Sequence, residues 1–442
     1  MATTAASRPL GSIRWMVCGF LFLATTILYF DRQILSLLKE PLHGLLHWTD
    51  TQYGLVNSAF QLSYGLSLLA FGWIVDRWGT KIGYALTIAG WSMAAMGTAL
   101  VSTLGGFFTA RVLLGFAEGG NFPAAIKTVA LWFPKKERAF ATSIFNSGAN
   151  VGAIAAPAIV PWLYFHFGWQ SAFLLAGMAG LVWLVFWVGW YQRPEHKKGL
   201  TAEEFSWIES DSGLENETAP KIPWVRLLGY RQTWAFILPK FLTDPVWWFY
   251  LFWLPSFFKD SRGLDIKHSW ILLVTIYTIV TLLSIGGGWV TGYLARIGWS
   301  LNHSRKAGML LFALCALPIL FVTRVGDWGA VLLIGLAGGA HQAWSATLFT
   351  TVSDTFPKSS IASVVGIGGL AGSVFGACFP YITGMVTDHF KALGDATTGY
   401  EILFGFCAFA YLLSLVLMQL LNPRLQAVQI TGTPSFPELT PP

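Results

Sequence analysis

Four charged residues lie inside long apolar stretches of the sequence: Asp31 and Arg32 in one stretch, Arg111 and Glu118 in another. A charge at the centre of a bilayer costs at least ~2.5–3.5 kcal/mol on insertion scales, so such residues usually serve a binding site or a relay. An arginine offers a carboxylate a two-pronged hydrogen bond and stays charged at every relevant pH. Burial raises the pKa of a carboxyl group, and a nearby arginine lowers it. We therefore expect these residues to bind an anion and to exchange a proton.

The spacing of these charges limits how they can act. Arg111 and Glu118 are seven positions apart, which is two helical turns and about 10 Å along one face. Gly115 lies between them and leaves room for a ligand or for another backbone. Asp31 and Arg32 are adjacent and point about 100° apart on a helix, so they cannot both face one partner. The four charges therefore form either a ligand and proton site or structural ion pairs that join two helices.

Polar and aromatic side chains elsewhere would complete such a site. Amides and hydroxyls can bind the hydroxyl groups of a ligand, and aromatic rings can cover its flat carbon faces. For any single amide or hydroxyl, hydrogen bonding between helices is an equally good explanation. Lys240 and Asp244 are spaced i,i+4, so they could neutralise one another, form a gate or contact the ligand. The other candidates are Tyr29, Gln61, Tyr64, Asn150, His341 and Trp344.

The elements that must position these side chains are membrane-spanning helices. Of the 442 residues, 54% are hydrophobic and only 11% are charged, whereas soluble domains carry about 25% charged residues. Apolar blocks of about 20 residues recur along the chain, which is the length that an α-helix needs to cross a bilayer. We therefore predict an all-α membrane protein with twelve helices, at 14–38, 51–75, 82–103, 105–132, 139–165, 170–192, 234–258, 269–294, 307–324, 329–355, 361–388 and 399–422.

A long polar interruption at 193–233 divides the predicted helices into six and six. Within it, Thr201 as N-cap with Glu203 and Glu204 in the first turn indicates a short amphipathic helix. The predicted domains are an N-terminal six-helix bundle at 1–192, a cytoplasmic linker at 193–233, a C-terminal six-helix bundle at 234–424 and a disordered cytoplasmic tail at 425–442.

The net charge of +6 raises the question of nucleic acid binding. The basic residues, however, lie in short loops between apolar blocks, and most fall on one side if both termini and the linker are cytoplasmic. We therefore expect a lipid bilayer as partner and no nucleic acid. The four cysteines lie in apolar blocks without metal-ligand spacing, and no catalytic cluster is evident. We expect no metal, no cofactor and no enzymatic activity.

One loop signature, G-x-x-x-D-R-x-G-x-[RK], is matched by Gly72-Trp-Ile-Val-Asp76-Arg77-Trp-Gly79-Thr-Lys81. By this segment the chain resembles the major facilitator superfamily of transporters. The resemblance implies two pseudo-symmetric six-helix bundles with a substrate site between them. It also implies that Asp76, Arg77 and Lys81 act in gating at the cytoplasmic ends of helices and are not ligands.

A finer resemblance covers nearly the whole chain. The elements that carry it are Tyr29-Phe-Asp31-Arg32-Gln, Arg111-Val-Leu-Leu-Gly115-Phe-Ala-Glu118-Gly119 and Phe145-Asn146-Ser-Gly-Ala-Asn150. These resemble the anion:cation symporter family, which moves organic anions with protons or sodium. The segment Lys240-Phe-Leu-Thr-Asp244-Pro-Val-Trp247 resembles the hexuronate branch, which imports glucuronate and galacturonate.

This resemblance implies import of a sugar-acid anion by proton symport and alternating access, by a monomer in a bacterial inner membrane. A symporter of another anion, such as galactonate or glucarate, is an alternative, and so is a membrane sensor that does not translocate its ligand. Asp31 and Glu118 would carry the proton. The expected substrate-binding residues are Arg32, Tyr29, Tyr64, Asn150, Arg111, Gln61, Trp344 and His341.

Overall fold

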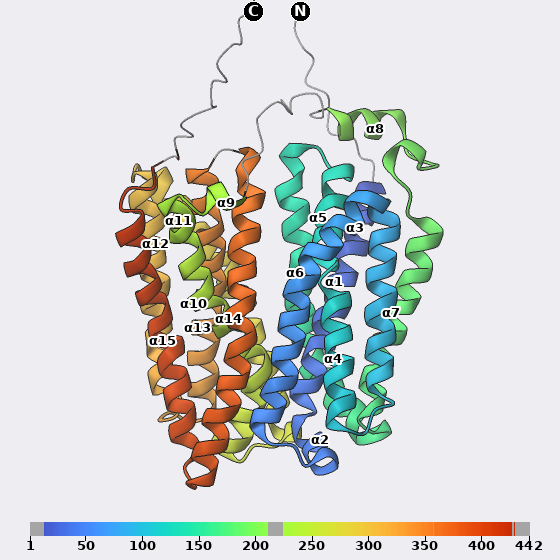
Figure 1. Ribbon diagram of the computed structural model, residues 1–442. Helices are drawn as coiled ribbons and strands as arrows, with labels where there is room; N and C mark the ends of the chain where they lie inside the picture. The colour runs from blue at the N-terminus through green and yellow to red at the C-terminus, as the bar shows by residue number, and fades with distance from the viewer. Residues whose placement is uncertain (1–12, 211–223, 357, 427, 429–442) are drawn as a thin grey trace, which may run out of the picture.

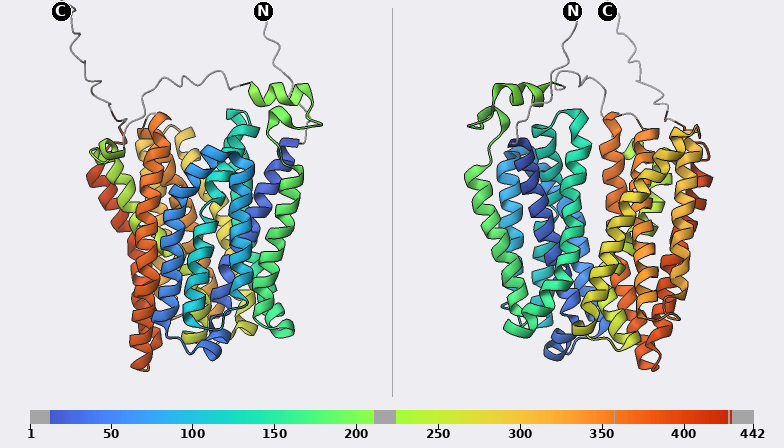
Figure 2. Two further views of the ribbon diagram at one scale, coloured as in Figure 1. Left: turned by 45° about the vertical axis from the view of Figure 1, so that its right-hand side comes forward. Right: turned by 180° about the vertical axis from the view of Figure 1, so that it is seen from behind.

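The computed structural model describes residues 13–210, 224–356, 358–426 and 428, and in these ranges the chain consists of helices and short connections (Figure 1). The helices stand side by side in two groups. The N-terminal group ends with α7 (Gln170–Trp190), and the C-terminal group contains α10 (Arg231–Arg262) and the helices that follow it (Figure 2). The predicted tail at 425–442 lies almost entirely outside the described residues.

The N-terminal group contains six membrane spans. Its helices are α1 (Ile13–Leu37), α2 (Lys39–Leu46), α3 (Asp50–Thr98), α4 (Leu104–Glu118), α5 (Asn121–Trp132), α6 (Lys135–Phe167) and α7. The long α3 is two spans, because Gly79 adopts a positive φ of 82° and turns the chain between them. The single helix predicted at 105–132 is instead divided into α4 and α5 at Gly119 and Gly120. A Cβ at either glycine would strike residues of α3, so the two glycines allow α3 to pack closely on the α4–α5 span.

The described part of the linker contains a short 3₁₀ turn, Pro194–His196, and α8 (Ala202–Glu209). Thr201 is the N-cap of α8 and accepts a hydrogen bond from the backbone N–H of Glu204, as predicted. Glu204 is buried and pairs with Arg14 of α1, whose Nε also pairs with Glu137 of α6 at 3.0 Å. The Arg14–Glu204 pair docks the linker helix on the N-terminal bundle, and the Arg14–Glu137 pair joins α1 to α6.

The C-terminal group supplies the other six spans. Its elements are α9 (Trp224–Leu227), α10, α11 (Ile266–Arg296), α12 (Leu301–Ala316) with the 3₁₀ turn Leu317–Phe321, α13 (Asp327–Thr355), α14 (Lys358–Ala392) and α15 (Ala396–Leu421). The start of α1, the end of α15 and α8 lie at one end of the molecule, and α2 lies at the opposite end (Figure 1).

Eight stretches among the described residues are long and apolar enough to cross a membrane. The second half of α3, the α4–α5 pair, α10 and α13 complete the twelve spans. The α4–α5 pair, α10 and α13 carry candidate site residues in their interior, among them Glu118 in α4, Lys240 in α10 and His341 in α13. At 15 and 12 residues, α4 and α5 are each too short to cross a bilayer alone, and they do so as a pair.

Candidate functional site

The centre of the N-terminal bundle holds a direct contact between α1 and α4. Nε of Arg32 donates a hydrogen bond to Oε2 of Glu118 at 2.6 Å, and both side chains are almost completely buried. An arginine–carboxylate contact of this length is a strong, charge-assisted hydrogen bond. Of the four charges predicted to act together, these two meet directly.

Aromatic rings surround the Arg32 guanidinium. Its carbon lies 4.8 Å from the centroid of the Tyr29 ring and 4.6 Å from that of Tyr64. The rings of Phe60 and Trp248 both lie at 5.5 Å. A guanidinium over ring faces gains cation–π stabilisation without giving up its hydrogen-bond donors. Trp248 belongs to α10, so the site of Arg32 is built from both bundles.

Asp31 and Arg111 are also buried, at 1% exposure each, but the described structure gives several of their atoms no hydrogen-bond partner. Both carboxylate oxygens of Asp31 are unpartnered, as are Nε and Nη2 of Arg111 and Oε1 of Glu118. Asp31 interacts electrostatically with Glu118, Arg111 and Arg32. Because buried polar atoms are normally satisfied, this cluster has capacity to bind a further hydrogen-bonding group.

Gly115 marks a close approach of α4 to α3. A Cβ at this position would strike the carbonyl of Phe60 and the hydroxyl of Ser63. The sequence predicted that Gly115 leaves room either for a ligand or for another backbone, and the structure shows the backbone of α3 in that position. That approach brings Phe60 and Tyr64 of α3, which stack at 6.2 Å, to the side of Arg32.

The remaining N-terminal candidates lie on α3 and α6. Gln61 is completely buried, and neither its amide nitrogen nor its oxygen has a hydrogen-bond partner in the described structure. Asn150 is half-buried on α6. It lies two positions before Gly152, where α6 packs directly on the backbone of α1 next to Tyr29. Gln61 and Asn150 thus lie on helices that flank the cluster, and no direct contact with Arg32 is described.

The C-terminal candidates form two separate contacts. Lys240 pairs with Asp244 at 2.7 Å, and the Asp244 carboxylate lies against Gly372 of α14. Nδ1 of His341 is 2.9 Å from the Tyr411 hydroxyl, and its ring stacks on Trp247. Trp344 is fully buried and also packs on Tyr411, with ring centroids 5.6 Å apart. His341 and Trp344 therefore contact α15 and are not among the rings around Arg32.

The predicted gating residues lie at the turn between the two spans of α3. Arg77 is exposed, with its guanidinium carbon 5.8 Å from the Trp73 ring centroid. Lys81 is half-buried, and its carbonyl accepts a hydrogen bond from the Trp187 indole. The side chain of Asp76 lies outside the described part of the chain. Their gating role stays a prediction.

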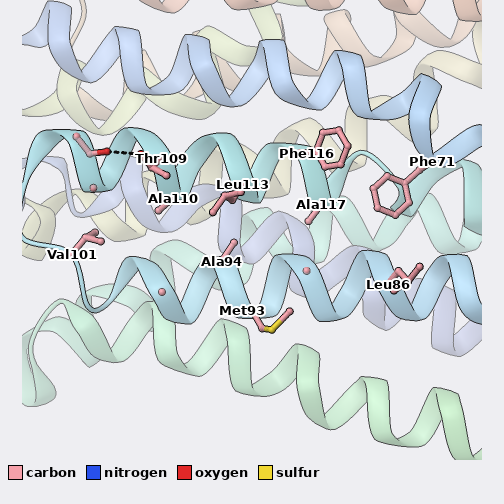
Figure 3. Close-up of a pocket in the computed structure, with 14 residues that line it drawn as sticks. Phe71, Leu86, Met93, Ala94, Val101, Thr109, Ala110, Leu113, Phe116 and Ala117 are labelled. Atoms are coloured by element: carbon pink, nitrogen blue, oxygen red, sulfur yellow. Dashed lines mark hydrogen bonds between the residues drawn. The ribbon is translucent and has the colours of Figure 1, made fainter. Parts of the chain in front are cut away.

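An apolar groove of about 770 Å³ lies between the second span of α3 and α4 (Figure 3). Its lining includes Leu86, Met93, Leu113 and Phe116, all of which are exposed. Arg111 and Glu118 do not line it, although their neighbours Ala110 and Ala117 do. The groove therefore belongs to the outer, lipid-facing side of α4, and the charged cluster lies on the inner side.

Comparison with known proteins identifies the class. The family model of the Major Facilitator Superfamily matches residues 21–380. The chain belongs to the major facilitator superfamily. Its two six-helix bundles and its membrane location follow from this membership, and it is a transporter and not an enzyme.

Curated members of the superfamily match this chain over most of its length. The hexuronate transporter of Escherichia coli (strain K12) is 30% identical over 438 residues, which is 98% of this chain and 100% of that protein. The galacturonate transporter of Dickeya chrysanthemi is 33% identical over 58% of this chain and 75% of its own length. The D-galactonate transporter of Escherichia coli O6:H1 is 26% identical over 86% and 90%.

Solved structures support the fold. A bacterial homolog of the human lysosomal transporter Spinster covers 94% of this chain and 98% of its own, with a TM-score of 0.73 at 17% identity. The D-xylose-proton symporter gives the same TM-score at 12% identity and covers 94% and 99%. At these identities the likeness concerns the major facilitator fold alone.

The sequence made Trp248 one of three tryptophans, with Trp247 and Trp344, that could stack on a sugar. It did not indicate that Phe60 and Trp248 lie next to Arg32, because the two residues belong to helices far apart in the sequence. The i,i+4 spacing of Phe60 and Tyr64 was a usable signal, because it places both rings on one helix face. No local pattern indicates that Trp248, rather than Trp247, faces Arg32.

Proposed function

We propose that this protein imports a hexuronate such as glucuronate or galacturonate together with a proton, as a monomer in the bacterial inner membrane with both termini cytoplasmic. The observation that carries the proposal is the buried contact between Arg32 and Glu118, set among aromatic rings. The similarity to hexuronate and galacturonate transporters supports the choice of substrate.

The substrate carboxylate competes with Glu118 for Arg32. Nε of Arg32 is bound to Glu118, so a second carboxylate that takes over this donor frees the Glu118 side chain. Arg111 has two unpartnered guanidinium nitrogens that can bind the substrate or receive Glu118. Tyr29, Tyr64 and Trp248 lie around the binding position and can cover the sugar ring.

Proton uptake then follows from charge balance. With both carboxyl groups ionised, Asp31 and Glu118 balance the charges of Arg32 and Arg111, and the empty site sums to zero charge. A bound hexuronate adds one negative charge, which is costly to bury. One proton taken up by Glu118 or Asp31 restores zero, so the balance favours one proton for each monoanion. The neutral, loaded site can then be exposed to the other side of the membrane at lower electrostatic cost.

Uptake of labelled glucuronate into cells that express this chain, with and without a protonophore, tests the proposal. We expect accumulation that the protonophore abolishes. Absence of uptake would remove the hexuronate assignment, whereas uptake that is indifferent to the protonophore would remove proton coupling.

A second candidate substrate is an aldonate such as galactonate, because a D-galactonate transporter is also among the similar proteins. It has the carboxylate that Arg32 requires but is an open chain with no sugar ring to stack on the aromatic rings. A competition panel of glucuronate, galacturonate, galactonate and glucarate distinguishes these substrates. The proposal predicts that the two hexuronates inhibit uptake at the lowest concentrations.

A further inference from the structure

A network of charged side chains joins the two bundles at the end of the molecule that is opposite α8 (Figure 1). Lys39 of α2 pairs with Asp50, the first residue of α3, at 2.7 Å. Asp50 also pairs with Lys391 of α14 at 2.7 Å, and Lys391 pairs with Asp260 of α10 at 2.8 Å. Asp260 in turn accepts a hydrogen bond from the Tyr400 hydroxyl. Within this network, the pair Asp50–Lys391 joins the two bundles.

A second link joins the same helices through the backbone. The carboxylate of Asp388, on α14, accepts hydrogen bonds from the backbone N–H groups of Asp50 and Thr51 at 2.9 and 2.7 Å. The first N–H groups of a helix have no partner within it and carry partial positive charge. A carboxylate from the C-terminal bundle therefore caps a helix of the N-terminal bundle.

The backbones themselves meet at this end. A Cβ at Gly384 would strike the carbonyl of Asp50, and a Cβ at Gly54 would strike the carbonyl of Pro380. Lys39 also donates to the Ser256 hydroxyl of the opposite bundle at 3.0 Å. Contacts this close require α3 and α14 to be pressed together, so this end of the molecule is closed.

The arrangement of charges makes the closure reversible. When the bundles separate, the Lys39–Asp50 pair stays intact in the N-terminal bundle. The Lys391–Asp260 pair stays intact in the C-terminal bundle. Lys39 and Lys391 therefore each keep a carboxylate partner, and opening does not turn either of them into an isolated buried cation. Opening loses the Asp50–Lys391 pair, the Asp388 cap, the Lys39–Ser256 hydrogen bond and the packing of α3 on α14.

We propose that Lys39, Asp50, Asp260 and Lys391 form a charge-balanced latch, reinforced by the Asp388 cap, that closes this end of the transporter and that opens once in each transport cycle. This inference rests on the proposed function, in which the site is exposed to alternate sides of the membrane. On the proposed orientation, the latch is the gate on the side from which substrate enters.

Spin-label distances across the latch test it without any substrate. Leu45 and Leu393 are exposed at this end, one on each bundle, and are replaced by labelled cysteines in a chain whose four native cysteines are removed. In the purified full chain we expect the distance between the two labels to be predominantly the short one of the closed state. Lys391→Gln or Asp388→Asn should lower the ratio of closed to open populations by a factor of about ten. Asp265→Asn is the matched control, since Asp265 is exposed at the same end and pairs with His268 of its own bundle.

A steric variant separates the charges from the packing. Gly384→Ala should also shift the distance towards the open value, whereas Gly44→Ala, which meets nothing within 4 Å, should not. An unchanged distance in both Lys391→Gln and Asp388→Asn overturns the latch, including when Gly384→Ala does shift it, because packing alone would then hold this end closed. Since no substrate is present, the distances report on the latch even if the protein does not transport hexuronates.

Discussion

Nε of Arg32 on α1 lies 2.6 Å from Oε2 of Glu118 on α4, in the interior of the N-terminal bundle. This pair gives a buried arginine a partner that a substrate carboxylate can replace. Replacement frees a carboxyl group at the position where an incoming negative charge must be balanced. Anion binding and proton uptake are therefore linked at one pair of side chains in the proposed mechanism.

We predict that Glu118→Gln uncouples transport from the proton gradient. The amide has nearly the shape of a protonated carboxyl group but cannot release a proton. Accumulation of glucuronate in vesicles with an imposed pH gradient should be lost, while exchange of internal for external glucuronate is retained. Undiminished proton-driven accumulation would remove Glu118 from the relay, and the same assay on Asp31→Asn would show whether that residue is needed too.

Arg32→Lys should weaken substrate binding although it keeps the charge. A lysine cannot form the two-pronged contact of a guanidinium and stacks less well on Tyr29 and Tyr64. We expect the KM for glucuronate to rise at least ~tenfold, the equivalent of one charge-assisted hydrogen bond. Arg324→Lys, at a side chain that is 69% exposed, is the control and should leave KM unchanged. An unaltered KM in Arg32→Lys would mean that another cation binds the carboxylate.

The pair Lys240–Asp244 should act mainly as a mutually neutralising pair. Removing one partner leaves a buried charge uncompensated, which costs about 3–5 kcal/mol, whereas removing both does not. Lys240→Gln and Asp244→Asn alone should reduce the yield of folded protein, and the double variant should restore both yield and uptake. A double variant that folds normally but no longer transports would instead assign the pair to substrate binding.

Gly115→Ala should destabilise the N-terminal bundle. The added methyl would strike the backbone of Phe60, and overpacking of this kind costs about 1–3 kcal/mol. We expect a lower melting temperature for the purified protein and weaker substrate binding, because α3 carries Tyr64 to Arg32. Gly105→Ala on the same helix meets nothing within 4 Å and is the control. Equal melting temperatures for the two variants would contradict the close approach of α3 and α4.

The sequence indicated the charged residues of the site because charges within apolar segments are costly and must be used or paired. It also indicated the spans, the linker helix at Thr201 and the membership of the superfamily. The division of the predicted helix 105–132 at Gly119 was not predictable, since a glycine within a helical pattern does not reveal whether another helix approaches it.

The contacts between the bundles were the least predictable. Trp248 reaches Arg32, and Asp50 reaches Lys391, only because two halves of the chain pack against each other. Nothing in the local pattern around Asp50 or Lys391 distinguishes them from ordinary charges at helix ends. The sequence predicted gating residues at Asp76, Arg77 and Lys81, and the structure shows a further network of charges at the opposite end.

The most direct measurement of the central claim is the number of protons taken up when substrate binds. Glucuronate is added to the purified protein in weakly buffered detergent solution with a pH-indicator dye. The account predicts uptake of about one proton for each bound glucuronate in the natural protein and none in Glu118→Gln. Binding without proton uptake in the natural protein, or equal uptake in Glu118→Gln, would contradict it.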